Sequence, residues 1–242
     1  MTTVIIPQWP LPVSVAACSS TRIGGTSLAP WDSLNLGAHC GDDPAHVEQN
    51  RRQMYAAANL PSLPVWLEQV HGKHVLNLDE PWEHKRADAA YTQQRGRVCA
   101  VMTADCLPVL FCNKAGTEVA AAHAGWRGLC GGVLEETVAH FQDSAGNIMA
   151  WLGPAIGPGA FEVGPEVHEA FVAKDAQATL AFRPEGDKFF ANIYQLARQR
   201  LNSLGITQIY GGDRCTVSEP ETFFSYRRDH TTGRMASFIW LR

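Results

Sequence analysis

A cysteine and a histidine flank a short loop in the middle of the chain. Cys106 lies in the stretch TADCLPV, and His123 lies in AAHAGWRG. The segments 109–112 and 118–122 between them are apolar, and the tetrapeptide NKAG at 113–116 favours a turn. A hairpin with that turn places Cys106 directly opposite His123, at a Cβ separation of about 4.5–5.5 Å. A slip of one or two residues still leaves the pair close, so we predict that the two side chains meet.

Cys106 and His123 support two kinds of chemistry. In the first, Cys106 is a thiolate nucleophile and His123 is its base. In the second, both bind a metal, and His71 in the string QVHG supplies a third ligand. A Cys/His/His set leaves the fourth position of a tetrahedral zinc ion open, which is typical of a catalytic site. Copper also accepts two histidines and a thiolate, but the chain has no His-x-His pair, so a multi-copper centre would be short of ligands.

Composition limits the partners and the compartment of the protein. Apolar residues make up 45% of the 242 residues, charged residues make up 18%, and the formal net charge is −4. The chain can therefore bury a sizeable core, and it shows no basic stripe of the kind that binds nucleic acid. No apolar run approaches the roughly 20 residues that span a bilayer, and the first residues lack the basic start of a signal peptide. The seven cysteines contain no C-x-x-C pair and do not suggest a disulfide framework. We expect a cytoplasmic monomer with no membrane or nucleic-acid partner.

The predicted elements mix helices and strands without regular alternation. Strands are predicted at 14–19, 65–70, 98–102, 109–112, 118–122, 148–152, 208–210 and 237–241. Helices are predicted at 44–58, 128–141, 165–173 and 192–204. This order favours an α+β fold with mixed β-sheets flanked by helices over a doubly wound parallel sheet. Because no low-complexity linker divides the chain, we expect a single layered domain over residues 1–242.

Seven strings along the chain together resemble a known family. They are SSTRIGG, SLNLG, VWLEQVHG, TADCLPV, AAHAGWRG, GPAIGP and FFSYRRD. In this order and spacing they resemble the polyphenol-oxidase-type purine nucleoside phosphorylases, also known as laccase-domain proteins. The resemblance implies a zinc-binding α+β domain in which His71, Cys106 and His123 are the zinc ligands. It also implies phosphorolysis of purine nucleosides such as adenosine, inosine and methylthioadenosine, and hydrolytic deamination of adenosine. Relatives often carry cysteine where this chain has Gly159, so we expect no ligand or nucleophile there.

Phosphorolysis requires a bound inorganic phosphate beside the purine nucleoside. A guanidinium group matches phosphate oxygens with a fork of N–H donors. Arg22 precedes a Gly-Gly pair, and Arg127 lies at the start of a predicted helix, where anions are favoured. We predict that these two arginines bind phosphate. Arg227 and Arg228 in SYRRD are weaker candidates.

Deamination and base recognition require further polar groups. Hydrolytic attack at the purine needs a group that carries a proton, and Asp105 beside Cys106 is the predicted catalytic acid. Asn35 and Gln69 are predicted to hydrogen-bond to the ribose or the base. With a thiolate mechanism, Cys106 and His123 are themselves the catalytic residues.

Four functions fit these residues. The leading hypothesis is a zinc-dependent purine nucleoside phosphorylase with adenosine deaminase activity. The second is the older assignment of the family, a copper-dependent, laccase-like polyphenol oxidase. The third is a metal-free Cys–His amide hydrolase that acts on peptide or cell-wall precursors. The fourth is a non-enzymatic, metal-dependent binding module. It is the least attractive, because it gives no role to the open fourth coordination position.

Overall fold

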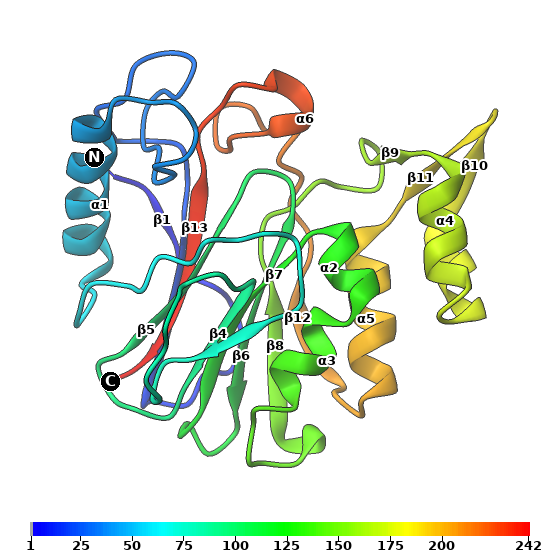
Figure 1. Cartoon of the computed structure of the whole chain (residues 1–242), viewed down its shortest axis with the longest axis horizontal. Helices are drawn as coiled ribbons and strands as arrows, with labels where there is room; N and C mark the ends of the chain where they lie inside the picture. The colour runs from blue at the N-terminus through cyan, green and yellow to red at the C-terminus, as the bar shows by residue number, and fades with distance from the viewer. Residues whose placement is uncertain (1) are drawn as a thin grey trace.

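Two stacked β-sheets lie between layers of helices (Figure 1). The computed structural model describes residues 2–242. Its layers run from helix α1 through a four-stranded sheet and a six-stranded sheet to a second group of helices. This arrangement confirms the predicted α+β fold with mixed sheets and flanking helices. The helices are α1 (Pro44–Ala58), α2 (Trp126–Gly131), α3 (Val133–Val138), α4 (Pro165–Val172), α5 (Ile193–Ser203) and α6 (Tyr226–Asp229).

The sheets differ in how their strands run. The four-stranded sheet is antiparallel and has the order β1 (Val4–Ile5), β2 (Val15–Ser20), β13 (Met235–Leu241) and β5 (Val98–Thr103). The six-stranded sheet is mixed, with parallel pairs at both edges, and has the order β12 (Gln208–Gly211), β8 (Ile148–Leu152), β6 (Leu107–Asn113), β7 (Val119–Ala124), β4 (Ala89–Thr92) and β3 (Val75–Asn77). A small antiparallel sheet beside α4 contains β10 (Phe182–Glu185), β11 (Lys188–Ala191) and β9 (Glu162–Val163). Among the described residues, no helix has the length and apolar character to cross a membrane.

Strand β6 lies at the centre of the six-stranded sheet, and both of its faces are buried. Val109 and Phe111 pack towards α2, α3 and α5, while Leu110 and Cys112 pack against the four-stranded sheet. A strand that is buried on both faces needs apolar side chains in succession, which explains the continuous run PVLFC. The turn that contains Cys106 joins β5 of one sheet to β6 of the other. Cys106 therefore lies where the two sheets meet.

The β6–β7 hairpin exists, but its register differs from the prediction. Pro108 pairs with His123, two residues along from the predicted partner Cys106. The turn is displaced because Asn113 remains in the strand, and its side-chain oxygen accepts hydrogen bonds from the N–H groups of Thr117 and Glu118. Since strand side chains alternate between faces, a shift of two residues leaves Cys106 and His123 on the same face. The predicted proximity survives the wrong register.

Two other predicted elements need correction, and two strands of the six-stranded sheet were not predicted. The helix predicted at 128–141 is two short helices, because Gly132 between them has a φ of 107° and breaks the first. The strand predicted at 65–70 is an extended loop in which only Glu68 forms an isolated bridge, with Arg86. Strands β3 and β4 were not predicted, although β4 is the direct neighbour of β7.

Candidate metal centre

Three potential metal donors converge at the end of the six-stranded sheet. The Cys106 sulfur lies 3.8 Å from Nε2 of His71, and one donor atom from each of His71, Cys106 and His123 lies within 4.8 Å of the others. The two imidazole rings are 4.8 Å apart and nearly perpendicular. His123 is buried, Cys106 is half-buried and His71 is exposed. The cluster is therefore closed on the His123 side and open to solvent on the His71 side.

The backbone around the cluster is shaped to leave room for it. His71 and Asp105 both have positive φ, at 59° and 91°, a conformation that non-glycine residues adopt rarely. Gly125 precedes α2, and a Cβ at that position would lie 2.9 Å from the Cys106 sulfur and 2.9 Å from Cδ2 of His71. A side chain at residue 125 would thus occupy the space that the donors enclose. The HAGWRG motif needs its first glycine for this reason.

Asp88 is a buried carboxylate beside the cluster that was not predicted from the sequence. Its side chain is fully buried, and its Oδ1 lies 2.8 Å from Nδ1 of His123. The same carboxylate accepts hydrogen bonds from the backbone N–H groups of Val70, His71 and Gly72. Histidines that bind metals commonly use their second nitrogen in this way. The only sequence signal was an acidic residue directly before the apolar run AAYT.

Charge is concentrated in the cluster. Burial opposes ionisation of the Cys106 thiol, but the positive charge of His123 and hydrogen bonds from His123 and His71 outweigh it and lower the pKa of Cys106 to about 6. Burial also opposes protonation of His123, yet the Cys106 thiolate and Asp88 raise the pKa of His123 to about 9. Without a metal, the pair is therefore a thiolate beside an imidazolium at neutral pH.

This charge state predicts how the metal-free protein reacts with an alkylating agent. The rate of Cys106 alkylation by iodoacetamide should rise with pH through a midpoint near 6 and then level off, because only the thiolate reacts. An ordinary thiol would instead reach its midpoint about 2–3 pH units higher. Peptide mass spectrometry can follow Cys106 separately, with the half-buried Cys40 as an internal comparison, since the pKa of Cys40 is raised by burial. A Cys106 midpoint no lower than that of Cys40 would contradict the assignment.

The three donors match the ligands that commonly bind a single zinc ion. A thiolate and two imidazoles are common zinc ligands, and three protein ligands leave one position for water or substrate. The hydrogen bond from Nδ1 of His123 to Asp88 leaves Nε2 of His123 to face the cluster. Throughout residues 2–242, no second group of three or more histidine, cysteine or acidic side chains comes close enough to hold a metal. The described residues therefore supply donors for one metal ion rather than for a multi-copper centre.

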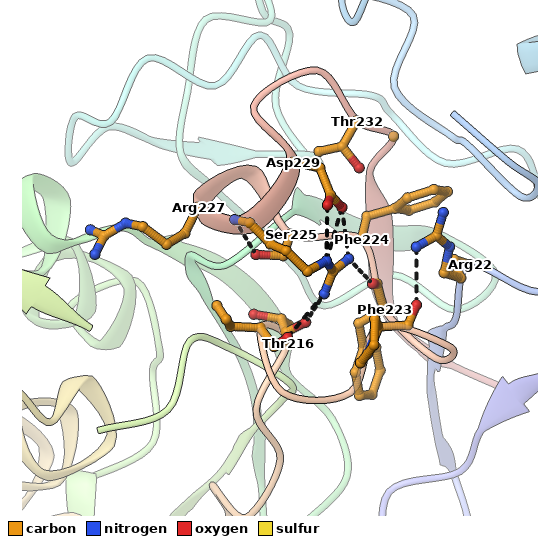
Figure 2. A network of polar contacts seen from close by, with 12 residues as sticks. Arg22, Thr216, Phe223, Phe224, Ser225, Arg227, Asp229 and Thr232 are labelled. Atoms are coloured by element: carbon orange, nitrogen blue, oxygen red, sulfur yellow. Dashed lines mark hydrogen bonds and ion pairs between the residues drawn. The ribbon is translucent and has the colours of Figure 1, made fainter. Parts of the chain in front are cut away.

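Asp105, the predicted catalytic acid, has both carboxylate oxygens engaged by the protein. Oδ1 accepts a hydrogen bond of 2.6 Å from the Thr216 hydroxyl, and Oδ2 accepts one of 2.6 Å from the backbone N–H of Arg227. Figure 2 shows Arg227 in α6 and Thr216 on a segment beside that helix. These contacts hold the turn that carries Cys106. A role of Asp105 in proton transfer stays a prediction.

Three of the predicted substrate-binding residues have their polar atoms occupied by the protein. Asn35 is fully buried, and its amide contacts Gly37, Asp42 and Arg234. Gln69 accepts from the N–H of Met102 and donates to its carbonyl, each at 2.7 Å, and so ties the loop before His71 to β5. Arg22 donates to carbonyl oxygens of Asp32 and Pro220, and it lies over the Phe224 ring, as Figure 2 shows. A role of these three residues in substrate binding stays a prediction.

Among the predicted arginines, Arg127 differs from the rest. Its guanidinium lies 4.5 Å from the Trp126 ring, and its side chain is exposed. The structure shows no hydrogen bond or ion pair from this guanidinium to any of residues 2–242. The weaker candidates are engaged, because Arg227 donates to the Glu162 carbonyl and Arg228 donates to carbonyl groups beside α6 and to Asp229 (Figure 2). Arg127 is thus the predicted arginine best able to bind an anion.

Comparison with known proteins agrees with the fold and the motifs. A family model described as "Multi-copper polyphenol oxidoreductase laccase" matches residues 16–242. The chain is 73% identical over 242 residues to the Escherichia coli (strain K12) protein named purine nucleoside phosphorylase YfiH, with full coverage of both chains. It is 55% identical to a purine nucleoside phosphorylase of Haemophilus influenzae, over 98% of each chain. The crystal structure of the Neisseria meningitidis protein NMB0706 is similar with a TM-score of 0.93 at 48% identity, over 98% of each chain. The chain therefore belongs to this laccase-domain family, as its motifs predicted.

Proposed function

We propose that the protein is a zinc-dependent purine nucleoside phosphorylase that also deaminates adenosine. The observation that supports this most is the cluster of His71, Cys106 and His123, which has an open, solvent-facing side. The relatives named purine nucleoside phosphorylase support an enzyme with a nucleoside and phosphate as its substrates. Adenosine, inosine and methylthioadenosine are the proposed nucleosides. The supply of donors for one metal ion favours zinc over the copper of a polyphenol oxidase.

The proposal gives each group in the cluster a role. His71, Cys106 and His123 would hold the metal, and Asp88 holds His123. A zinc ion supplies Lewis acidity and lowers the pKa of a bound water to about 7. Arg127 is the proposed phosphate-binding residue, because its guanidinium makes no hydrogen bond or ion pair with residues 2–242 and a guanidinium matches phosphate oxygens.

Removing and restoring the metal tests this function. Protein stripped with a chelator should convert neither adenosine nor inosine, and one equivalent of zinc should restore turnover. With phosphate, adenosine should yield free adenine and ribose 1-phosphate; without phosphate it should yield inosine. Liquid chromatography of the products distinguishes the two reactions. Absence of conversion under every metal load would contradict the proposal, and oxygen consumption with a phenol under copper load would favour the oxidase.

One observation supports a second function, a metal-free Cys–His hydrolase. Cys106, His123 and Asp88 form a chain of nucleophile, base and orienting acid, like the catalytic triads of acyl-transfer enzymes. His71 has no necessary part in such a triad. His71→Ala should therefore abolish zinc-dependent nucleoside turnover but leave a triad hydrolase active. Amide hydrolysis by metal-free His71→Ala protein would establish the second function over the first.

A further inference from the structure

Asp88 lies where the two histidine-bearing segments meet. It directly precedes β4, and its backbone carbonyl accepts a 2.7 Å hydrogen bond from the N–H of His123 in β7. Its side chain, fully buried, bridges from there to the loop that carries His71. One residue thus contacts both segments, which are far apart in the sequence.

All of the carboxylate's acceptor capacity is used for this bridge. Oδ1 lies 2.8 Å from Nδ1 of His123 and accepts a 2.9 Å bond from the N–H of His71. Oδ2 accepts from the N–H groups of Gly72 at 2.7 Å and of Val70 at 3.2 Å. A carboxylate has about four lone-pair sites. Each of them has a partner, so neither oxygen is left to serve as a general base.

The contact with His123 determines which nitrogen faces the cluster. An imidazole that donates from Nδ1 to a carboxylate presents Nε2 to a metal, and the contact also fixes the orientation of the ring. His123 is buried and the opposite side of its ring faces Cys106 and His71. The Asp88 contact therefore selects the donor atom as well as the direction in which it points.

The contacts with residues 70–72 determine where His71 lies. Three consecutive backbone N–H groups converge on one carboxylate, which is the type of anion-binding concavity that turns form. His71 within this turn has a φ of 59°, a conformation that is costly for a non-glycine residue unless the surroundings hold it. The His71 side chain is exposed and packs on one side against His123 and Cys106, while the backbone of its turn is held by the three N–H contacts with Asp88.

We propose that Asp88 is the positioning residue of the metal centre, because a single buried carboxylate orients His123 and holds the turn that presents His71. The inference rests on the proposed function for the metal itself, but the two contacts are independent of any metal. It assigns Asp88 a role in metal affinity rather than in proton transfer.

The test compares three variants with the wild-type protein in a zinc competition assay with a chromophoric chelator. Asp88→Asn keeps the shape but replaces one acceptor by a donor, and its zinc affinity should fall by about 10–100-fold. Asp88→Glu keeps the charge but displaces the carboxylate, and its affinity should fall as well. The matched control is Glu118→Gln, since Glu118 is also a buried carboxylate that accepts two backbone N–H bonds, but at the loop end of the β6–β7 hairpin. Its zinc affinity should equal that of the wild type.

Amide hydrogen exchange of the metal-free proteins supplies a second readout. The N–H groups of residues 70–72 should exchange faster in both Asp88 variants than in the wild type or Glu118→Gln. Wild-type zinc affinity in the Asp88 variants, or an equal loss in Glu118→Gln, would overturn the proposal. If the wild-type protein binds no zinc, the proposed function fails, and unchanged exchange at 70–72 in the Asp88 variants would then overturn the role of Asp88 separately. If Asp88→Asn does not fold, Asp88→Glu carries the same comparison.

Discussion

Cys106→Ser is expected to remove the metal from the protein. Serine places a weakly coordinating hydroxyl where the structure has a thiolate that is already favoured at neutral pH. Loss of a direct ligand should reduce zinc affinity by more than the roughly 10–100-fold that is typical when a residue hydrogen-bonded to a ligand is replaced. Nucleoside turnover at limiting zinc should fall by the same factor. Equilibrium dialysis against buffered zinc and the nucleoside assay measure the two effects on the same sample.

The metal readout is the informative one for this variant. A thiolate nucleophile and a metal ligand both predict loss of turnover on substitution by serine, but only a ligand predicts loss of zinc. Cys40→Ser is the matched control, because Cys40 is also half-buried and lies outside the cluster. Zinc affinity in Cys106→Ser equal to that of Cys40→Ser would show that the sulfur is not a ligand.

Gly125→Ala is expected to damage the centre although it replaces none of the three donor residues. The added Cβ would lie 2.9 Å from both the Cys106 sulfur and Cδ2 of His71, well inside the separation of about 3.5–4.0 Å at which such atoms pack. Overpacking of this kind costs about 1–3 kcal/mol. If the strain acts on the metal-bound state, zinc affinity should fall by roughly 5–150-fold. The same competition assay measures it.

Helix α2 offers a matched control for this substitution. Gly131 lies in the same helix, and a Cβ there would meet no atom within 4 Å. Gly131→Ala should leave zinc affinity unchanged and slightly favour the helix, since alanine has the higher helix propensity. If both alanine variants bind zinc like the wild type, the space at Gly125 is not needed by the centre.

The proximity of Cys106 and His123 could be predicted from the sequence although the predicted hairpin register was wrong, because side chains two residues apart in a strand lie on the same face. The predicted register of the hairpin was wrong by two residues, with Pro108 rather than Cys106 opposite His123. A one-residue error would have placed the two side chains on opposite faces, but a two-residue error keeps them together. His71 could be predicted only from the motif, because the strand expected before it is an extended loop.

The residues that support the donors could not be found in this way. Asp88 acts through hydrogen bonds to segments 16 to 18 and 35 residues away in sequence, and no local pattern encodes such a partner. Gln69 and Asn35 were identified in the sequence as substrate-binding residues, but their long-range hydrogen bonds to the protein's own backbone were not predicted. A side chain in a loop motif can serve the loop itself as readily as a ligand.

The fold was predictable where burial gives a strong pattern. The long helix α1 with Asp43 as its N-cap, the strand β8 and the helix α5 lie within a residue or so of their predicted bounds. Short strands such as β4, with four residues, have too little periodicity to stand out in sequence. The position of β4 is determined by its pairing with β7 and β3, which depends on the tertiary structure.

A zinc titration of the metal-free protein tests the central claim most directly. Nucleoside turnover and bound zinc, measured together, should rise in proportion and reach a plateau at one equivalent per chain, because the described residues form one donor cluster. In the same titration of Cys106→Ser, neither nucleoside turnover nor bound zinc should rise up to one equivalent of zinc per chain. Full turnover by protein that contains no metal, or a plateau at several equivalents, would contradict a single His71–Cys106–His123 centre.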